Sequence, residues 1–121
     1  MNERKGIVQK IVKILDSKKA RDISVLDIAQ LTTIADYFII ATGGSTTQVQ
    51  ALCDNIEEAL SKDGLSHTHK EGYHTASWIL LDYDGIIVHI FLEETREFYK
   101  LEHLWSDAER IDISEMVGEV I

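Results

Sequence analysis

Apolar residues recur at helical spacing near the start of the chain. Between Glu3 and Ser17 they fall mostly three or four positions apart, with charged and polar residues between them, which is the pattern of a helix with one buried face. The apolar positions are Ile7, Val8, Ile11, Val12, Ile14 and Leu15. The spacing predicts an amphipathic helix over Glu3 to Ser17.

The segments that follow change to the pattern of strands. "DISVLDI" and "DYFIIATGG" are short runs rich in β-branched and aromatic residues, and "AQLTTIA" joins them. The second run ends at Gly43 and Gly44, after which Ser45 and Gln48 have the spacing of a capping box. A second helix is expected there, and Gly64 ends it. Its apolar stripe consists of Val49, Leu52, Cys53, Ile56 and Leu60.

The stretch "WILLDYDGIIVHIF", from Trp78 to Phe91, predicts a β-hairpin. Asp-Gly between two apolar runs is a strong hairpin signal, so Asp84 and Gly85 are expected to form a two-residue turn. The paired positions are then Tyr83 with Ile86, Asp82 with Ile87, Leu80 with His89, and Trp78 with Phe91. Alternate side chains point to opposite faces. The almost wholly apolar face, expected to pack under the helices, comprises Ile79, Leu81, Tyr83, Ile86, Val88, Ile90 and Leu92.

The second face of this hairpin is mixed in character. It comprises Trp78, Leu80, Asp82, Ile87, His89 and Phe91. Large apolar groups beside an acid and a histidine are typical of an interface centre with a polar margin. In the alternative interpretation another helix covers this face and Trp78 belongs to the core. The interface interpretation predicts five partner-binding residues, which are Trp78, Leu80, Asp82, His89 and Phe91.

The C-terminal third carries one more helical pattern. "EETREFYKLEHLW" places Phe98, Leu101, Leu104 and Trp105 at helical spacing, and "RIDISEMVGEVI" is expected to add a short strand and a turn. The order helix, strand, strand, helix, strand, strand, helix indicates a small α/β (α+β) fold with a mixed β-sheet packed with helices. With 121 residues, the chain is expected to form a single domain over residues 1–121.

The charge balance narrows the choice of partners. Twelve Lys and Arg face 21 Asp and Glu, for a formal net charge of -9. Nucleic-acid backbones are bound by clustered cations, so this balance argues against direct nucleic-acid contact and favours a basic protein partner. The basic residues of the first 21 positions are expected to form a solvated helix face. No apolar run reaches the roughly 18 residues of a membrane span, so we expect a cytoplasmic protein without membrane contact.

Two arrangements in the sequence are candidate sites of phosphate or metal chemistry. Gly43 and Gly44 precede a helix, as in phosphate-binding turns, but the P-loop lysine and the third glycine of a dinucleotide fingerprint are missing. Asp82 and Asp84 resemble the paired acids of metal-dependent nucleotidyltransferases, yet they follow Ser45 only after a whole helix and a long loop. The hairpin turn explains Asp84 without any metal.

The histidines and the cysteine complete no site either. His67, His69 and His74 share one polar loop, but no carboxylate or cysteine gives them a recognised zinc spacing. Cys53 is the single cysteine, and its apolar neighbours predict a buried, unreactive side chain. The sequence therefore predicts neither a catalytic site nor a cofactor.

Four stretches in this order resemble the Iojap family, also called the ribosomal silencing factor (RsfS) family. They are "ADYFIIATGGSTTQ", "EG" at Glu71 and Gly72, "WILLDYDGIIVHIF" and "TREFYKLEHLW". The resemblance runs from about Ile11 to Ile113. It implies a fold related to nucleotidyltransferases without their catalysis. It also implies binding to the large ribosomal subunit through large-subunit ribosomal protein fourteen, which blocks joining of the small subunit and represses translation under nutrient limitation.

Two other functions remain as alternatives at this point. One is a metal-dependent enzyme of the nucleotidyltransferase type. The other is a homodimeric scaffold that buries the Trp78 face on a second copy of itself. The silencing factor differs from both because it acts by occupying a surface, with no chemical step.

Overall fold

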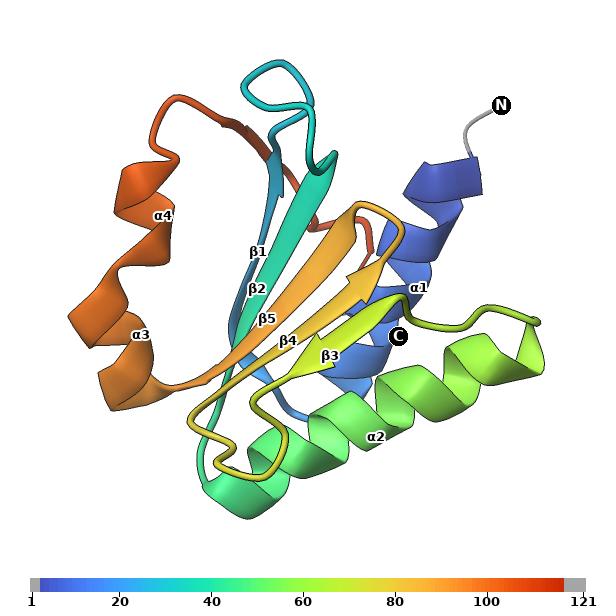
Figure 1. The fold of residues 1–121 in the computed structure, drawn as a ribbon, viewed down its shortest axis with the longest axis vertical. Helices are drawn as coiled ribbons and strands as arrows, with labels where there is room; N and C mark the ends of the chain where they lie inside the picture. The colour runs from blue at the N-terminus through green and yellow to red at the C-terminus, as the bar shows by residue number, and fades with distance from the viewer. Residues whose placement is uncertain (1–2, 117–121) are drawn as a thin grey trace.

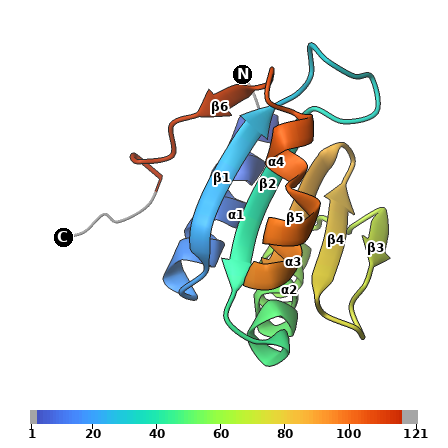
Figure 2. The same ribbon diagram turned by 90° about the vertical axis from the view of Figure 1, so that its left-hand side faces the viewer.

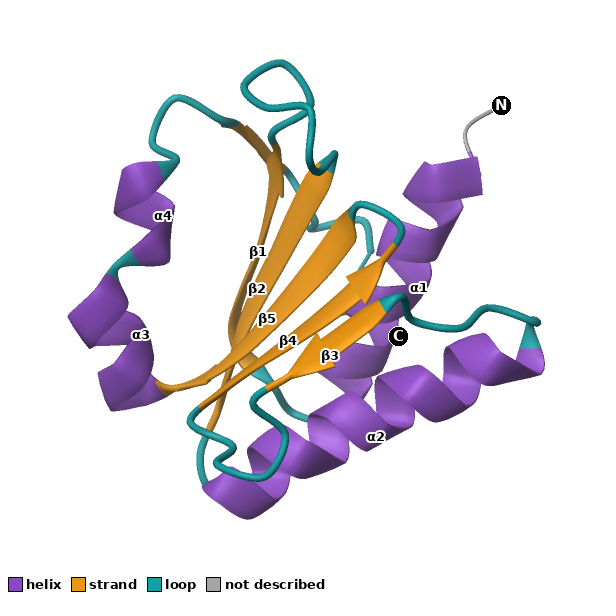
Figure 3. Cartoon of the chain, viewed as in Figure 1, coloured by secondary structure: helices purple, strands orange, loops and turns teal. Residues whose placement is uncertain are grey.

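A computed structural model describes residues 3–116, which form a six-stranded mixed sheet with helices on both faces (Figures 1 and 3). The helices are α1 (Glu3–Ser17), α2 (Thr46–Lys62), α3 (Glu93–Tyr99) and α4 (Leu101–Leu104). The strands are β1 (Arg21–Asp27), β2 (Tyr37–Gly43), β3 (His69–Glu71), β4 (Trp78–Tyr83), β5 (Ile86–Leu92) and β6 (Glu109–Ile111). The predicted fold class is confirmed. Within the described residues, no helix is long and apolar enough to cross a membrane.

The strand order is β3-β4-β5-β2-β1-β6. The central pair, β2 and β5, is parallel, while all the other neighbouring strands in this sheet are antiparallel. A parallel pair needs a crossover connection, and α2 lies within the connection between β2 and β5. The predicted strand in the C-terminal tail is confirmed as β6, which pairs with β1; residues 117–121 of that tail lie outside the described part.

The main core lies between the sheet and the layer formed by α1 and α2 (Figure 1). The predicted bounds of the first helix are confirmed, and its apolar residues Val8, Ile11, Val12 and Leu15 are buried. All five residues of the predicted α2 stripe are buried as well. Burial raises the pKa of the Cys53 thiol to about 12, so this cysteine is a neutral apolar side chain, as predicted.

The β4–β5 hairpin has the predicted register at all four pairs. Asp84 and Gly85 have φ values of 53° and 96°, and two consecutive positive φ angles are typical of a type I′ turn. A side-chain contact supports the turn, because the backbone N–H of Gly85 donates to Oδ1 of Asp82 at 2.9 Å. Asp82 therefore has a local structural role that the sequence did not reveal.

The predicted single C-terminal helix is wrong. The chain instead forms two short helices, because Lys100 between them adopts a left-handed conformation with a φ of 48°. This break changes the helical phase, so Leu101 is buried while Phe98 and Leu104 are 78% and 76% exposed. Strand β3 was also missed: its three residues are all exposed, and its pairing with β4 defines it as a strand.

Substitutions in the hairpin turn test its geometry. We expect Gly85→Ala to lower the free energy of unfolding by more than about 1 kcal/mol, because alanine is strained at this positive φ. Its added methyl carbon would also lie 2.8 Å from Nη2 of Arg4. The control, Asp84→Asn, is expected to change the free energy by less than about 0.5 kcal/mol, since asparagine tolerates the same turn. Urea unfolding measures both; equal losses would contradict the turn assignment.

Candidate partner-binding face

Helices α3 and α4 cover only part of the sheet face that lies opposite α1 and α2. In Figure 2 they lie in front of β2 and β5, whereas β4 and β3 at one side have no helix in front of them. On the covered strands β2 and β5, Leu101 and Trp105 pack in a second, smaller apolar cluster with Phe38 and Phe91. The uncovered part of this sheet face, at β3 and β4, is called the open face below.

Three of the five predicted partner-binding residues lie on the open face. Trp78, Leu80 and Asp82 alternate along β4 and are each partly exposed. Glu71 of β3 pairs with Leu80, which extends this surface to the edge strand. A shallow hollow in it is lined by Glu71, Gly72, Trp78 and Leu80.

The other two predicted residues are buried. Phe91 has no exposed surface and His89 is only 4% exposed. This part of the face follows the alternative interpretation, in which a helix covers it. Binding through His89 and Phe91 stays a prediction, and with α3 and α4 in place these residues can act only from behind the open face.

An exposed aromatic ridge joins α3 to the open face. The ring centroid of Tyr99 lies 4.9 Å from that of Trp78 and 5.0 Å from that of Phe98. Tyr99 is 51% exposed. Sequence reasoning missed Tyr99 and Phe98 as surface residues because an unbroken helix would turn Phe98 inward. The missed feature is the left-handed conformation of Lys100, which separates the two helices.

Trp78 is tied to His89 by a hydrogen bond. The indole Nε1–H of Trp78 donates to Nδ1 of His89 at 3.0 Å, so Nδ1 carries no proton. Burial lowers the pKa of His89 to about 3, and the imidazole is neutral at physiological pH with its proton on Nε2. Nε2 is buried and has no hydrogen-bond partner among the described residues.

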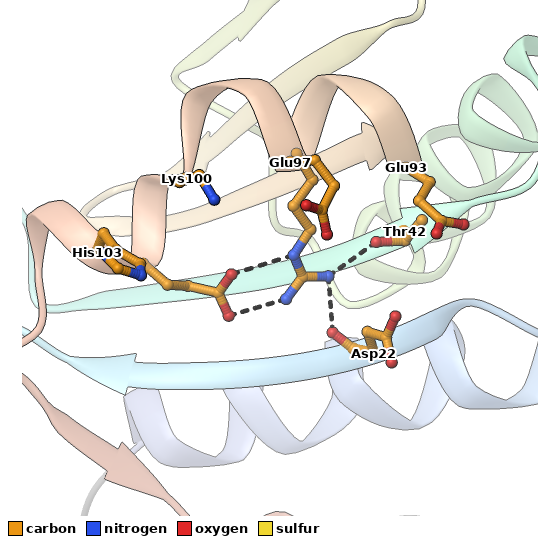
Figure 4. Close-up of a pocket in the computed structure, with 8 residues that line it drawn as sticks. Asp22, Thr42, Glu93, Glu97, Lys100 and His103 are labelled. Carbon is orange, nitrogen blue, oxygen red and sulfur yellow. Dashed lines mark hydrogen bonds and ion pairs between the residues drawn. The ribbon is translucent and has the colours of Figure 1, made fainter.

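Arg96 clamps the two short helices to the sheet through hydrogen bonds, drawn as dashed lines in Figure 4, that reach toward the labelled Asp22 and Thr42. Its Nε and Nη2 donate to the two carboxylate oxygens of Glu102 at 3.1 and 2.9 Å. Its Nη1 donates to the backbone oxygen of Asp22 in β1 and to Oγ1 of Thr42 in β2, both at 2.8 Å. Four of the five N–H groups of a guanidinium are thereby used internally. The hollow around this clamp, although it contains Arg96, is therefore not a ready anion site.

Glu102 completes the clamp from α4. Burial raises the pKa of its carboxyl, but the hydrogen bonds and charge of Arg96, with a further hydrogen bond from Ser24, outweigh burial and hold the pKa below its ordinary value. Arg110 also approaches Glu102, at 3.5 Å, from a largely exposed position. Glu102 is thus a charged acceptor that binds α3, α4 and β1 together.

Charges are distributed unevenly over the molecule. The ridge is flanked by acids of α3, and a hollow beside Phe98 is lined by Glu93, Glu94 and Glu97. The basic cluster belongs mainly to α1, in the opposite layer (Figure 1). Several of its members are paired with acids, such as Lys10 with Asp63 and Arg21 with Glu93. The ridge is therefore bordered by acids, and the basic cluster lies mainly in the opposite layer.

The acids and histidines that are candidates for metal chemistry have other roles in the structure. Asp82 accepts from the turn, while the side chain of Asp84 is 94% exposed and lies 3.9 Å from Arg4. Residues 3–116 contain no group of three or more His, Cys, Asp or Glu that could hold a metal ion. Of the loop histidines, His67 pairs with Glu57 at 3.2 Å.

The glycine turn before α2 is closed by its own helix. Ser45 Oγ accepts from the N–H of Gln48, which confirms that half of the predicted capping box. The return bond differs from the prediction, because Gln48 Oε1 accepts from the N–H of Gly44 at 2.6 Å. A Cβ at Gly43 would lie 2.8 Å from a methyl carbon of Val49. The glycines therefore permit close packing, and the N–H groups of Gly44 and Gln48 are already used.

Comparisons with known proteins agree on one family. The family model described as "Ribosomal silencing factor during starvation" matches residues 1–120. "Ribosomal silencing factor RsfS" of Bacillus subtilis (strain 168) is 37% identical over 113 residues, 93% of this chain and 95% of the relative. "Mitochondrial assembly of ribosomal large subunit protein 1" of Mus musculus is 30% identical over 82% of this chain and 45% of its own length. A crystal structure from Chromobacterium violaceum matches with a TM-score of 0.82, 32% identity and coverage of 84% and 85% of the two chains.

The contribution of the Arg96–Glu102 pair to stability can be tested by removing each charge alone and both together. Arg96→Met and Glu102→Met are each expected to lower the free energy of unfolding by about 1–3 kcal/mol, because each removes the bidentate partner of a charge that is largely withdrawn from water. The double variant should lose less than the sum of the two. Arg110→Met is the control and should lose less than about 0.5 kcal/mol, as a largely exposed cation. Urea unfolding gives all four values; additive losses would show that the pair does not act as a unit.

The burial of His89 predicts an acid-sensitive stability. Between pH 6.5 and about 3 the unfolded chain binds a proton at this histidine and the folded chain does not. The free energy of unfolding therefore falls as the pH is lowered through this window, by up to about 1.4 kcal/mol per pH unit from this group. His89→Phe should flatten that slope and His103→Gln should not. Urea unfolding across the window measures the slopes, and an unchanged slope in His89→Phe would contradict the assignment.

Proposed function

This chain belongs to the family of ribosomal silencing factors, and on that premise we propose that it binds the large ribosomal subunit through large-subunit ribosomal protein fourteen. Bound there, it blocks joining of the small subunit and represses translation when nutrients are limiting. The family name supports a role in translation regulation at the ribosome. The name of the mouse relative supports the large subunit as the partner.

One observation carries the assignment of the binding site: an exposed aromatic ridge continues onto an uncovered sheet face. Buried aromatic side chains commonly contribute most to interface affinity, and here Trp78 and Tyr99 stand in contact at the centre of such a surface. Leu80 adds apolar area beside them. Contiguous apolar groups exposed at a protein surface often mark a site of contact.

The acidic surroundings suit a ribosomal protein as the partner. Ribosomal proteins that bind RNA are generally basic, so Glu71, Asp82 and Glu97 at the margin would attract them and speed encounter. Acids at the margin are expected to act mainly on the association rate and its salt dependence. The aromatic centre is expected to determine how long the complex lasts.

The proposed mechanism is steric. A domain that binds beside the surface where the subunits join needs no bond making or breaking to prevent joining. The N–H of Gly44 and one carboxylate oxygen of Asp82 have partners within the fold, which supports a protein that is not an enzyme and uses no cofactor. We also propose that it acts in the cytoplasm, where bacterial ribosomes assemble.

Trp78→Ala tests the proposal directly. We expect the variant to bind isolated large-subunit protein fourteen, and whole large subunits, about thirtyfold more weakly, which corresponds to the roughly 2 kcal/mol of an aromatic anchor. The free variant is expected to stay folded, since Trp78 is partly exposed. Affinity is measured by calorimetry, and subunit joining by sedimentation of mixed subunits with and without the protein.

Ile34→Ser is the control for this experiment. Ile34 is 78% exposed in the loop between β1 and β2 and belongs neither to the ridge nor to the open face, so its replacement should leave affinity unchanged. Wild-type protein that binds large subunits yet allows joining would refute the steric mechanism. Self-association that Trp78→Ala abolishes, without ribosome binding, would favour the homodimeric scaffold.

A further inference from the structure

His89 is a polar side chain inside an aromatic cluster. Its ring centroid lies 4.6 Å from that of Phe38, 5.9 Å from that of Trp78 and 6.2 Å from that of Phe91. The Phe38 ring in turn meets Trp105 at 5.3 Å. His89 therefore stands between the covered cluster beneath α4 and the open face that carries Trp78.

At position 89, an apolar ring would stabilise the folded state more than the imidazole does. It leaves Nε2 buried without a partner among the described residues, and an unpaired buried N–H destabilises the folded state. A phenylalanine at this position would present a similar ring to its aromatic neighbours and would carry no polar atom. The feature that histidine adds is the acceptor at Nδ1, which receives the indole N–H of Trp78.

That hydrogen bond constrains the indole in two ways. It selects one orientation of the ring at the edge of the open face, so less conformational freedom is lost when a partner binds. It also turns the N–H of Trp78 inward, and the partner then meets carbon atoms of the indole. Without the acceptor, the partly exposed indole could turn its N–H toward water instead.

Resting on the proposed function, we propose that His89 is a positioning residue: through its bond to Trp78 Nε1–H it holds the indole in the orientation that binds the ribosomal partner. His89 itself makes no contact with that partner. The partner, in turn, is expected to present an apolar or cationic group to the indole ring and no acceptor to the indole N–H.

Replacement of His89 separates stability from binding. His89→Phe is expected to keep or raise the midpoint of thermal unfolding at pH 7 and to weaken binding to large subunits about threefold to tenfold, the range of one net hydrogen bond. In His89→Asn, the side-chain oxygen takes roughly the place of Nδ1, so binding should recover toward wild type although the protein is less stable. A purely structural role would give the same order in both measurements.

A double-mutant cycle shows whether His89 acts through Trp78. Trp78→Phe lacks the indole N–H, so adding His89→Phe to it should cost no further affinity. An equal loss in both backgrounds would overturn the proposal, because His89 would then act independently of the indole.

An NMR measurement on the free protein tests, without the ribosome, whether His89 holds the indole of Trp78 in place. Trp105→Phe leaves one indole N–H signal, that of Trp78. We expect this proton to exchange slowly with water in the His89 protein and at least tenfold faster after His89→Phe. Equal exchange rates would overturn the proposal. If wild-type protein binds no large subunit but the exchange rates differ as expected, the proposed function fails while the positioning stands.

Discussion

The bidentate pair between Arg96 and Glu102 determines which part of the outer sheet face is covered. Helices of seven and four residues are too short to be stable alone, so contacts to the sheet must hold them. Arg96 supplies these contacts by reaching β1 at Asp22 and β2 at Thr42 while it binds Glu102. The clamp ties α3 and α4 to that half of the sheet, and β4 and β3 remain open.

The same arrangement makes one aromatic cluster serve two purposes. On the covered side Phe38 and Phe91 are buried with Trp105 packed against their cluster, and this side stabilises the fold. On the open side Trp78 and Tyr99 continue the cluster to the surface, where their rings are available to a partner. Because Trp78 rests on a packed core, it is held in place in the free protein, which in the proposed complex reduces the entropy lost on binding.

Patterns in the sequence predicted α1 and the β4–β5 hairpin, whose structures depend mainly on residues close together in the chain. The spacing of apolar residues predicted α1 to its ends, and Asp84-Gly85 fixed the hairpin register at every pair. The break at Lys100 was not predictable in this way, because lysine has no preference for a positive φ and the conformation depends on the distant contacts of Arg96. Strand β3 depends likewise on pairing with β4.

The candidate site was predictable to a similar extent. Alternation along β4 placed Trp78, Leu80 and Asp82 on one face, but it could not show that α4 covers the neighbouring strand at His89 and Phe91. Whether a helix lies over a strand depends on tertiary structure, and two adjacent strands can differ in this respect. The extent of the open face is therefore set by where α3 and α4 end, and in the proposed complex the aromatic groups just beyond that end contribute most of the binding energy. Because the N–H of Gly44 is bound by Gln48, and the carboxylate of Asp82 by the N–H of Gly85, the exposed rings and bordering acids of the open face make it the surface that we propose for a partner.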